Sequence, residues 1–128
     1  MVRRDRNHPC VVLWSTGNEI REQANEEGHR IARQLTEIVK QYDTTRPVTA
    51  GCNNQRAGTN GFQKTVDVFG YNYKPHLYEK FRATNSTIPL IGSETASTVS
   101  SRGIRGRHYS DQARVVSARE RDIPAPVG

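Results

Sequence analysis

Two glutamates close two short apolar stretches of the chain. Glu19 follows residues 11–15 through Thr-Gly-Asn, and Glu94 follows residues 88–91 through Gly-Ser. Each stretch predicts a short buried strand with a carboxyl group at its carboxyl end. A pair of carboxyl groups in these positions, one an acid and one ionised, is what hydrolysis of a glycosidic bond requires. The two glutamates therefore indicate an enzyme, or a part of one.

The rest of the chain predicts alternating strands and helices that could hold these groups. After a strand over residues 11–15, Asn25 is a plausible N-cap for a helix, which the proline at position 47 cannot continue. Apolar side chains recur on one face of that helix, at Ile31, Leu35, Ile38, Val39 and Tyr42. Further strands are predicted over residues 48–52, 66–73 and 89–93, with a loop over 53–61 and a short helix over 76–84.

Strands that alternate with helices predict an α/β fold with a parallel sheet. A parallel (β/α)8 TIM barrel needs eight strands and typically about 250 residues. The 128 residues of this chain supply four strands, so the predicted fold is a partial barrel. Its open edges could pair with a second copy of the chain, which makes self-association an open possibility.

Composition and charge limit the kinds of partner that are expected for this chain. No apolar run approaches the roughly 20 residues of a membrane span, so no membrane partner is expected. The net charge of +6 comes mainly from arginine, concentrated between Arg102 and Arg121. Only Tyr109 interleaves as an aromatic there, so nucleic acid is not the expected partner. A solvated tail is expected, and a basic module that binds an acidic partner stays open as an alternative.

The two cysteines are predicted to be unpaired. Cys10 precedes the first predicted strand, and Cys52 ends the next one. In neighbouring parallel strands these positions lie near opposite ends, on the order of 15–20 Å apart. A disulfide needs Cα atoms within about 7 Å of each other, so two free thiols are expected.

Residues 5–19 resemble the acid/base motif of glycoside hydrolase family 2, the β-galactosidase and β-glucuronidase group. The family writes this motif R-N-H-P-S-(apolar)-W-S-x-G-N-E, and the visible departure is Cys10 in place of the usual serine or other small residue. Residues 47–53, 67–73 and 91–97 also resemble family segments, in the same order. The resemblance covers about residues 3–103 and implies strands four to seven of the catalytic barrel. It divides the chain into a partial barrel over residues 1–104 and a basic tail over 105–128.

The resemblance implies roles for particular residues in a retaining β-glycosidase. Glu19 matches the general acid/base and Glu94 the nucleophile. Asn18 matches a residue that hydrogen-bonds the sugar 2-hydroxyl, and Tyr73 a tyrosine beside the nucleophile. A retaining mechanism needs the carboxyl groups about 5–5.5 Å apart. Glu19 must also stay protonated near neutral pH, which the neighbouring Glu94 anion favours.

Other interpretations of these residues stay open on the sequence. Either glutamate alone could be a solvated turn residue, Asn18 could cap a turn, and Tyr73 could be a core aromatic. His76 follows the same strand as Tyr73, where a contact with a sugar is a further possibility. No spacing of His, Cys, Asp and Glu predicts a metal site.

The resemblance also implies the substrate class. A carbohydrate is expected, with β-galactoside first and β-glucuronide or β-mannoside as alternatives on the same machinery. No cofactor is expected. Some relatives use a magnesium ion, whose remaining ligands would lie outside this chain. The isolated chain is expected to be an inactive fragment, because half a barrel lacks half of the sugar-binding wall.

Overall fold

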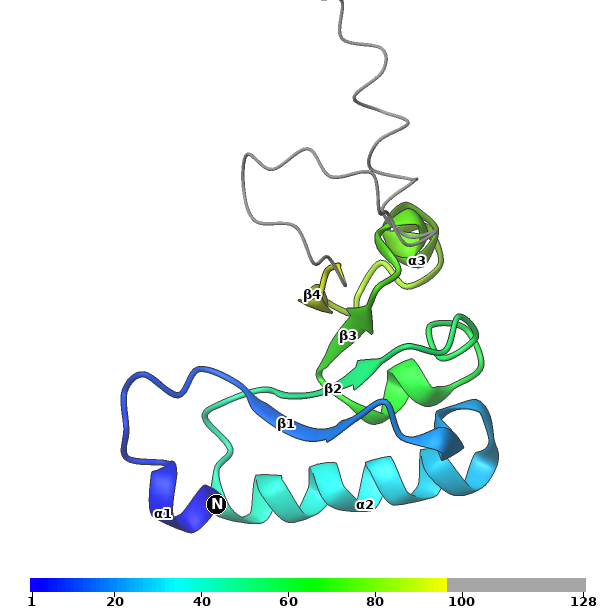
Figure 1. Ribbon diagram of the computed structural model, residues 1–128. Helices are drawn as coiled ribbons and strands as arrows, with labels where there is room; N and C mark the ends of the chain where they lie inside the picture. The colour runs from blue at the N-terminus through cyan, green and yellow to red at the C-terminus, as the bar shows by residue number, and fades with distance from the viewer. Residues whose placement is uncertain (97–128) are drawn as a thin grey trace, which may run out of the picture.

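Residues 1–96 are the part of the chain that the computed structural model describes (Figure 1). The basic tail predicted over residues 105–128, and its boundary at residue 104, lie outside the described residues. The strands are β1 (Trp14–Asn18), β2 (Val48–Cys52), β3 (Val68–Asn72) and β4 (Leu90–Glu94). The helices are α1 (Val2–Asp5), α2 (Glu26–Tyr42) and α3 (Tyr78–Thr84), with 3-10 turns η1 (Arg21–Ala24), η2 (Phe62–Thr65) and η3 (Pro75–Leu77).

The four strands form one parallel sheet in the order β1-β2-β3-β4. Strand order in space equals strand order in the sequence, as in consecutive βα units of a barrel. Figure 1 shows α2 alongside β1 and β2, and α3 beside β3 and β4. The predicted α/β partial barrel is confirmed for residues 1–96.

The core lies between the sheet and the helices. Successive strand residues point to opposite faces, so Phe69 and Tyr71 share the helix side while Gly70 and Asn72 share the other face. Phe81 of α3 stacks on Phe69 with ring centroids 4.9 Å apart, and it meets Tyr71 edge-on. This aromatic cluster fixes α3 against the sheet and so fixes the carboxyl end of β3.

Helix α2 begins and ends where the sequence predicts, and its N-cap is confirmed. The Asn25 side chain accepts a hydrogen bond from the backbone N–H of Gly28 at 3.0 Å. The predicted apolar face is only partly right, because the helix packs chiefly through the smaller Ala32 and through Val39. Leu35 and Ile38 remain 38% and 49% exposed, since they flank that contact. No helix in residues 1–96 is both long and apolar enough to cross a bilayer.

The first strand begins three residues later than predicted. The sequence predicts a buried strand over residues 11–15, whereas β1 spans Trp14–Asn18. The β1–β2 ladder starts where the Trp14 N–H donates to the carbonyl of Pro47 at 3.0 Å. Residues 11–13 precede that ladder, and Val12 is 73% exposed. Apolar content alone does not make a strand without a partner strand beside it.

The cysteines are free, as predicted. Cys10 is exposed, and Cys52 is buried at the carboxyl end of β2. Burial disfavours the thiolate and raises the pKa of Cys52 to about 12. Cys52 therefore behaves as a small apolar side chain of the core.

Asp43 ties the amino ends of β1 and β2 to the end of α2. Its carboxylate accepts hydrogen bonds from the Thr45 hydroxyl at 2.6 Å and from the Trp14 indole N–H at 2.9 Å. The Arg46 guanidinium adds a contact at 2.8 Å, and the side chain of Asp43 is buried. These bonds, led by those from Thr45 and Trp14, hold the pKa of Asp43 well below its usual range.

This carboxylate makes stability depend on pH. The folded pKa of Asp43 lies below its unfolded value of 3.8, so its contribution is fully present above about pH 4 and is lost as the pH falls through the folded pKa. We expect Asp43→Asn to be less stable than wild type at pH 7, with the difference narrowing below pH 4. Urea unfolding of both proteins from pH 2 to pH 7 measures this. A difference that stays constant over that range would contradict the assignment.

Candidate active site

The predicted glutamates meet at the carboxyl ends of the strands. One nitrogen, Nδ2 of Asn72, lies 3.0 Å from Oε1 of Glu19 and 2.9 Å from Oε1 of Glu94. Because both oxygens lie within 3.0 Å of the same nitrogen, they are no more than about 6 Å apart. Residues at the carboxyl ends of the first and fourth strands are thereby brought close together.

Two irregularities in the sheet bring this about. The β1–β2 register runs from Ser15 opposite Thr49 to Asn18 opposite Gly51, so β1 carries one extra residue. The β3–β4 register likewise runs from Gly92 opposite Tyr71 to Glu94 opposite Asn72. A bulge of one residue moves every later side chain of that strand to the other face. The side chains of Asn18 and Glu94 therefore lie on the inner face. In regular strands they would lie on the helix side.

The backbone turns left-handed at two residues of the site. Glu19 has φ +52° and Tyr73 has φ +57°, which side chains other than glycine adopt at a cost of roughly 1–2 kcal/mol. The chain stays in the ladder at both, because the Glu19 N–H donates to Gly51 and the Tyr73 N–H donates to Glu94. This turn lets two consecutive side chains reach the site: Asn18 with Glu19, and Asn72 with Tyr73.

Asn72 is the residue that sequence reasoning missed. Its side chain is fully buried, and Nδ2 also lies 2.9 Å from Oδ1 of Asn18. The Ser93 hydroxyl donates to Oδ1 of Asn72 at 2.6 Å. A signal for it existed in the strand pattern. Asn72 alternates with the aromatics Phe69 and Tyr71, which places a polar side chain at the last inner position of β3.

Two glycines make room for the side chains that surround Asn72. A Cβ on Gly51 would lie 2.4 Å from Oδ1 of Asn18 and 3.1 Å from Oδ1 of Asn72. A Cβ on Gly70 would lie 2.7 Å from the carbonyl oxygen of Ala50 and 2.8 Å from the Ser93 hydroxyl. Both glycines face the inner side of the sheet. The space that their side chains would fill is occupied by the polar side chains around Asn72.

Tyr73 contacts Glu94, as expected from the sequence. Its hydroxyl donates a hydrogen bond to Oε2 of Glu94, the oxygen that Asn72 does not reach. This bond to the carboxylate, with burial and the nearby carboxyl charges, raises the pKa of Tyr73 to about 12. Tyr73 therefore remains a protonated donor throughout the physiological pH range.

The structure does not bring His76 into this cluster. His76 lies exposed on η3, beyond the carboxyl end of β3, and makes no hydrogen bond or ion pair with another residue of 1–96. Asn18 is exposed on the inner face and its Oδ1 is held by Asn72. Among residues 1–96 no three His, Cys, Asp or Glu side chains gather as metal ligands, so we derive no step through a metal ion.

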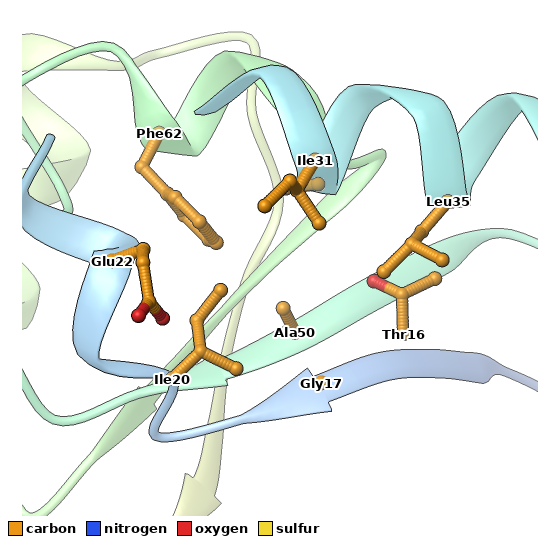
Figure 2. Close-up of a pocket in the computed structure, with 9 residues that line it drawn as sticks. Thr16, Gly17, Ile20, Glu22, Ile31, Leu35, Ala50 and Phe62 are labelled. Atoms are coloured by element: carbon orange, nitrogen blue, oxygen red, sulfur yellow. The ribbon is translucent and has the colours of Figure 1, made fainter. Parts of the chain in front are cut away.

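A small apolar pocket lies on the opposite face of the sheet. Figure 2 shows Ile20, Ile31 and Phe62 pointing into the space between α2 and the strands. Its volume is about 110 Å³, and Ala50, which lines it, points away from the face that Gly51 shares with Asn72. This pocket belongs to the packing of α2 and is separate from the carboxyl groups.

Comparison with known protein families identifies the family of this chain. A family model described as "Glycosyl hydrolases family 2, TIM barrel domain" matches residues 1–116. The chain therefore belongs to glycosyl hydrolase family 2 and forms part of its TIM barrel domain.

Relatives of this family extend well beyond the chain. A β-galactosidase of Bacteroides ovatus is 34% identical over 134 residues, which covers 80% of this chain and 16% of the relative. A β-glucuronidase of Chlorocebus aethiops is 39% identical over 72 residues, or 56% of this chain and 11% of that protein. A solved family 2 structure from Bacteroides cellulosilyticus superposes with a TM-score of 0.69 at 46% identity, covering 73% of this chain and 13% of that one. The chain thus spans less than a fifth of the length of these relatives.

The close approach at Gly51 can be tested by stability. We expect Gly51→Ala to lower the free energy of unfolding by about 1–3 kcal/mol, because the new methyl group would overlap the Asn18 amide on a strand paired on both sides. Gly17→Ala is the matched control, since its Cβ would meet only Ile20 at 3.4 Å, an ordinary contact. Urea unfolding of both variants measures the difference. Equal effects at the two glycines would contradict the crowding at Gly51.

Proposed function

We propose that this chain supplies the catalytic carboxyl groups of a retaining β-glycosidase, with Glu94 as nucleophile and Glu19 as acid and base. One observation carries the proposal: a single nitrogen of Asn72 contacts both carboxyl groups. The resulting limit of about 6 Å suits the separation of about 5–5.5 Å in retaining enzymes. It is shorter than the roughly 6.5–9.5 Å that inverting enzymes need to admit a water molecule.

In the first step the ionised Glu94 attacks the anomeric carbon of the sugar. A bond forms between a Glu94 oxygen and that carbon, while the bond to the leaving oxygen breaks. Glu19 gives its proton to the leaving oxygen and becomes a carboxylate. The Tyr73 hydroxyl donates to Oε2 of Glu94, which orients the carboxylate for attack.

In the second step water replaces the leaving group. Glu19, now ionised, takes a proton from the water as its oxygen attacks the anomeric carbon. The bond between the sugar and Glu94 breaks, and Glu94 is released as a carboxylate. Both steps proceed with inversion at the anomeric carbon, so the product retains the β configuration.

We further propose that Asn18 holds the sugar 2-hydroxyl. Its Oδ1 accepts from Asn72, which fixes the amide plane. Its Nδ2 makes no hydrogen bond within residues 1–96, and the side chain is exposed on the inner face, so this nitrogen is available to a hydroxyl group. His76 is proposed as an outer contact to the substrate, because it lies exposed beyond the carboxyl end of β3.

The proposed substrate is a β-galactoside. The relative that covers 80% of the chain is named a β-galactosidase, which supports this choice. A β-glucuronide is the second candidate, since the relative from Chlorocebus aethiops is named a β-glucuronidase. A β-mannoside shares the same chemistry. The side chains that distinguish these sugars are proposed to lie outside the four described strands.

The proposal is tested in a closed barrel. Residues 3–96 would replace the matching segment of the Bacteroides ovatus β-galactosidase, and nitrophenyl β-galactoside, β-glucuronide and β-mannoside would be offered. We expect galactoside hydrolysis that Glu94→Gln abolishes, because the amide is not a nucleophile. Glu19→Gln should slow a nitrophenyl galactoside by about 10²–10⁴-fold, and azide should restore turnover by replacing the activated water. Proton NMR should show the β anomer of galactose first.

Two results would contradict this assignment. One is a folded chimera, verified by circular dichroism and size exclusion, whose activity survives Glu94→Gln. The other is an α anomer as the first product, which would require an inverting mechanism. We expect the 128-residue chain alone to show no turnover, since the four strands of residues 1–96 supply only half of a barrel.

A further inference from the structure

The amide of Asn72 faces more acceptors than it has hydrogens. Its Nδ2 carries two hydrogens, whereas three oxygens lie within 3.0 Å: Oδ1 of Asn18, Oε1 of Glu19 and Oε1 of Glu94. The orientation of the amide is fixed, because Oδ1 of Asn72 accepts from the Ser93 hydroxyl. A flipped amide would instead place Oδ1 against three acceptor oxygens. At any moment one of the three acceptors must therefore either share a hydrogen with another acceptor or receive no hydrogen bond from Asn72.

We propose that Asn72 is a positioning residue that serves both carboxyl groups, giving a hydrogen to whichever of Glu19 and Glu94 is ionised. This inference rests on the proposed function for its place in the reaction. It follows from the strength of the bonds, because a hydrogen bond to a carboxylate is roughly twice as strong as one to a neutral group.

The reaction changes which oxygen is favoured. Before substrate reacts, Glu94 is ionised and Glu19 carries a proton, so Glu94 holds an Asn72 hydrogen and Asn18 accepts the other. Once Glu94 is esterified to the sugar it has no charge. Glu19 has lost its proton and is the carboxylate, so the same amide stabilises Glu19 as the base for the second step. The nitrogen need not move, since it already lies 3.0 Å from Glu19 and 2.9 Å from Glu94.

The surroundings of the amide suit this role. Asn72 is fully buried, with backbone on β3 that is paired to β2 and β4. Because Gly51 and Gly70 have no side chains, Asn18 and Ser93 can lie beside this amide and bond to it. Nδ2 of Asn85 also lies near three acceptors, but these are the carbonyls of Gly58 and Phe81 and the hydroxyl of Thr84, none of which changes charge.

The first test uses the 128-residue chain and does not depend on catalysis. Nitrogen-edited NMR would follow the two side-chain amide protons of Asn72 from pH 3 to pH 9. We expect these protons to respond to pH in wild type, and expect Glu19→Gln and Glu94→Gln each to remove a different part of the response. The side-chain amide of Asn85 should respond to neither substitution. An Asn72 amide that senses one glutamate alone, or neither, would overturn the proposal even if the protein is a glycosidase.

The second test uses the chimera and separates the two chemical steps. With a dinitrophenyl galactoside the second step limits turnover, because the leaving group needs no acid. We expect Asn72→Ala to slow that step by about ten- to a hundredfold, the loss of one hydrogen bond to a charged group. The acid limb of the kcat profile should also move to higher pH, since ionised Glu19 has lost a donor.

Asn85→Ala is the matched control for this measurement. It removes an amide with a purely structural set of partners, namely the carbonyls of Gly58 and Phe81 and the side chains of Gln63 and Thr84. It should lower the unfolding midpoint and leave the pH profile unchanged. An unshifted pH profile of kcat for Asn72→Ala would overturn the proposal that Asn72 stabilises ionised Glu19. A parent chimera with no activity would contradict the proposed function instead.

Discussion

The contact of one buried amide with two carboxyl groups is the constraint that organises this structure. Asn72 lies on the third strand, next to the strand that ends in Glu94 and one strand removed from the strand that ends in Asn18. For the three side chains to meet, the first and fourth strands must each carry one extra residue before the site, and both do. The glycine at position 51 must also lack a side chain, because a Cβ there would occupy the space of the Asn18 amide. Bulges, glycine and register are thus parts of one geometric requirement.

The two ends of the sheet are held by different kinds of interaction. At the amino ends, Asp43 accepts a hydrogen bond from the Trp14 indole and pairs with Arg46, while Asp67 accepts from the backbone N–H of Val48 and pairs with Lys40. At the carboxyl ends the backbone adopts left-handed turns at Glu19 and Tyr73, and the glutamates are bonded by neutral side chains. The first arrangement favours stability. The second holds the candidate catalytic residues in a conformation that costs energy, which the rest of the sheet must support.

Strand and helix positions followed from the sequence wherever local chemistry decided them. The Asn25 cap and the helix to Tyr42 are local signals, and β2 was predicted at its observed bounds because both of its faces are buried. The strand predicted over residues 11–13 does not form, because a strand needs a partner strand beside it, and apolar content does not report that partner. The family resemblance selected Glu19, Glu94 and Tyr73, and the structure places these together. It did not select Asn72, because a bulge in each outer strand decides which side chains meet it, and apolar periodicity does not report a bulge.

Within residues 1–96 the groups that donate to the carboxyl pair are neutral. Within residues 1–96 no salt bridge involves Glu19 or Glu94, and their donors are the amide of Asn72 and the hydroxyl of Tyr73. An arginine at the position of Asn72 would favour two ionised carboxylates at once and so leave no acid for the first step. Neutral donors stabilise a carboxylate without adding charge, which suits the proposed mechanism, in which the ionised partner changes between the two steps. A buried asparagine with two hydrogens is suited to that task in a way that a fixed positive charge is not.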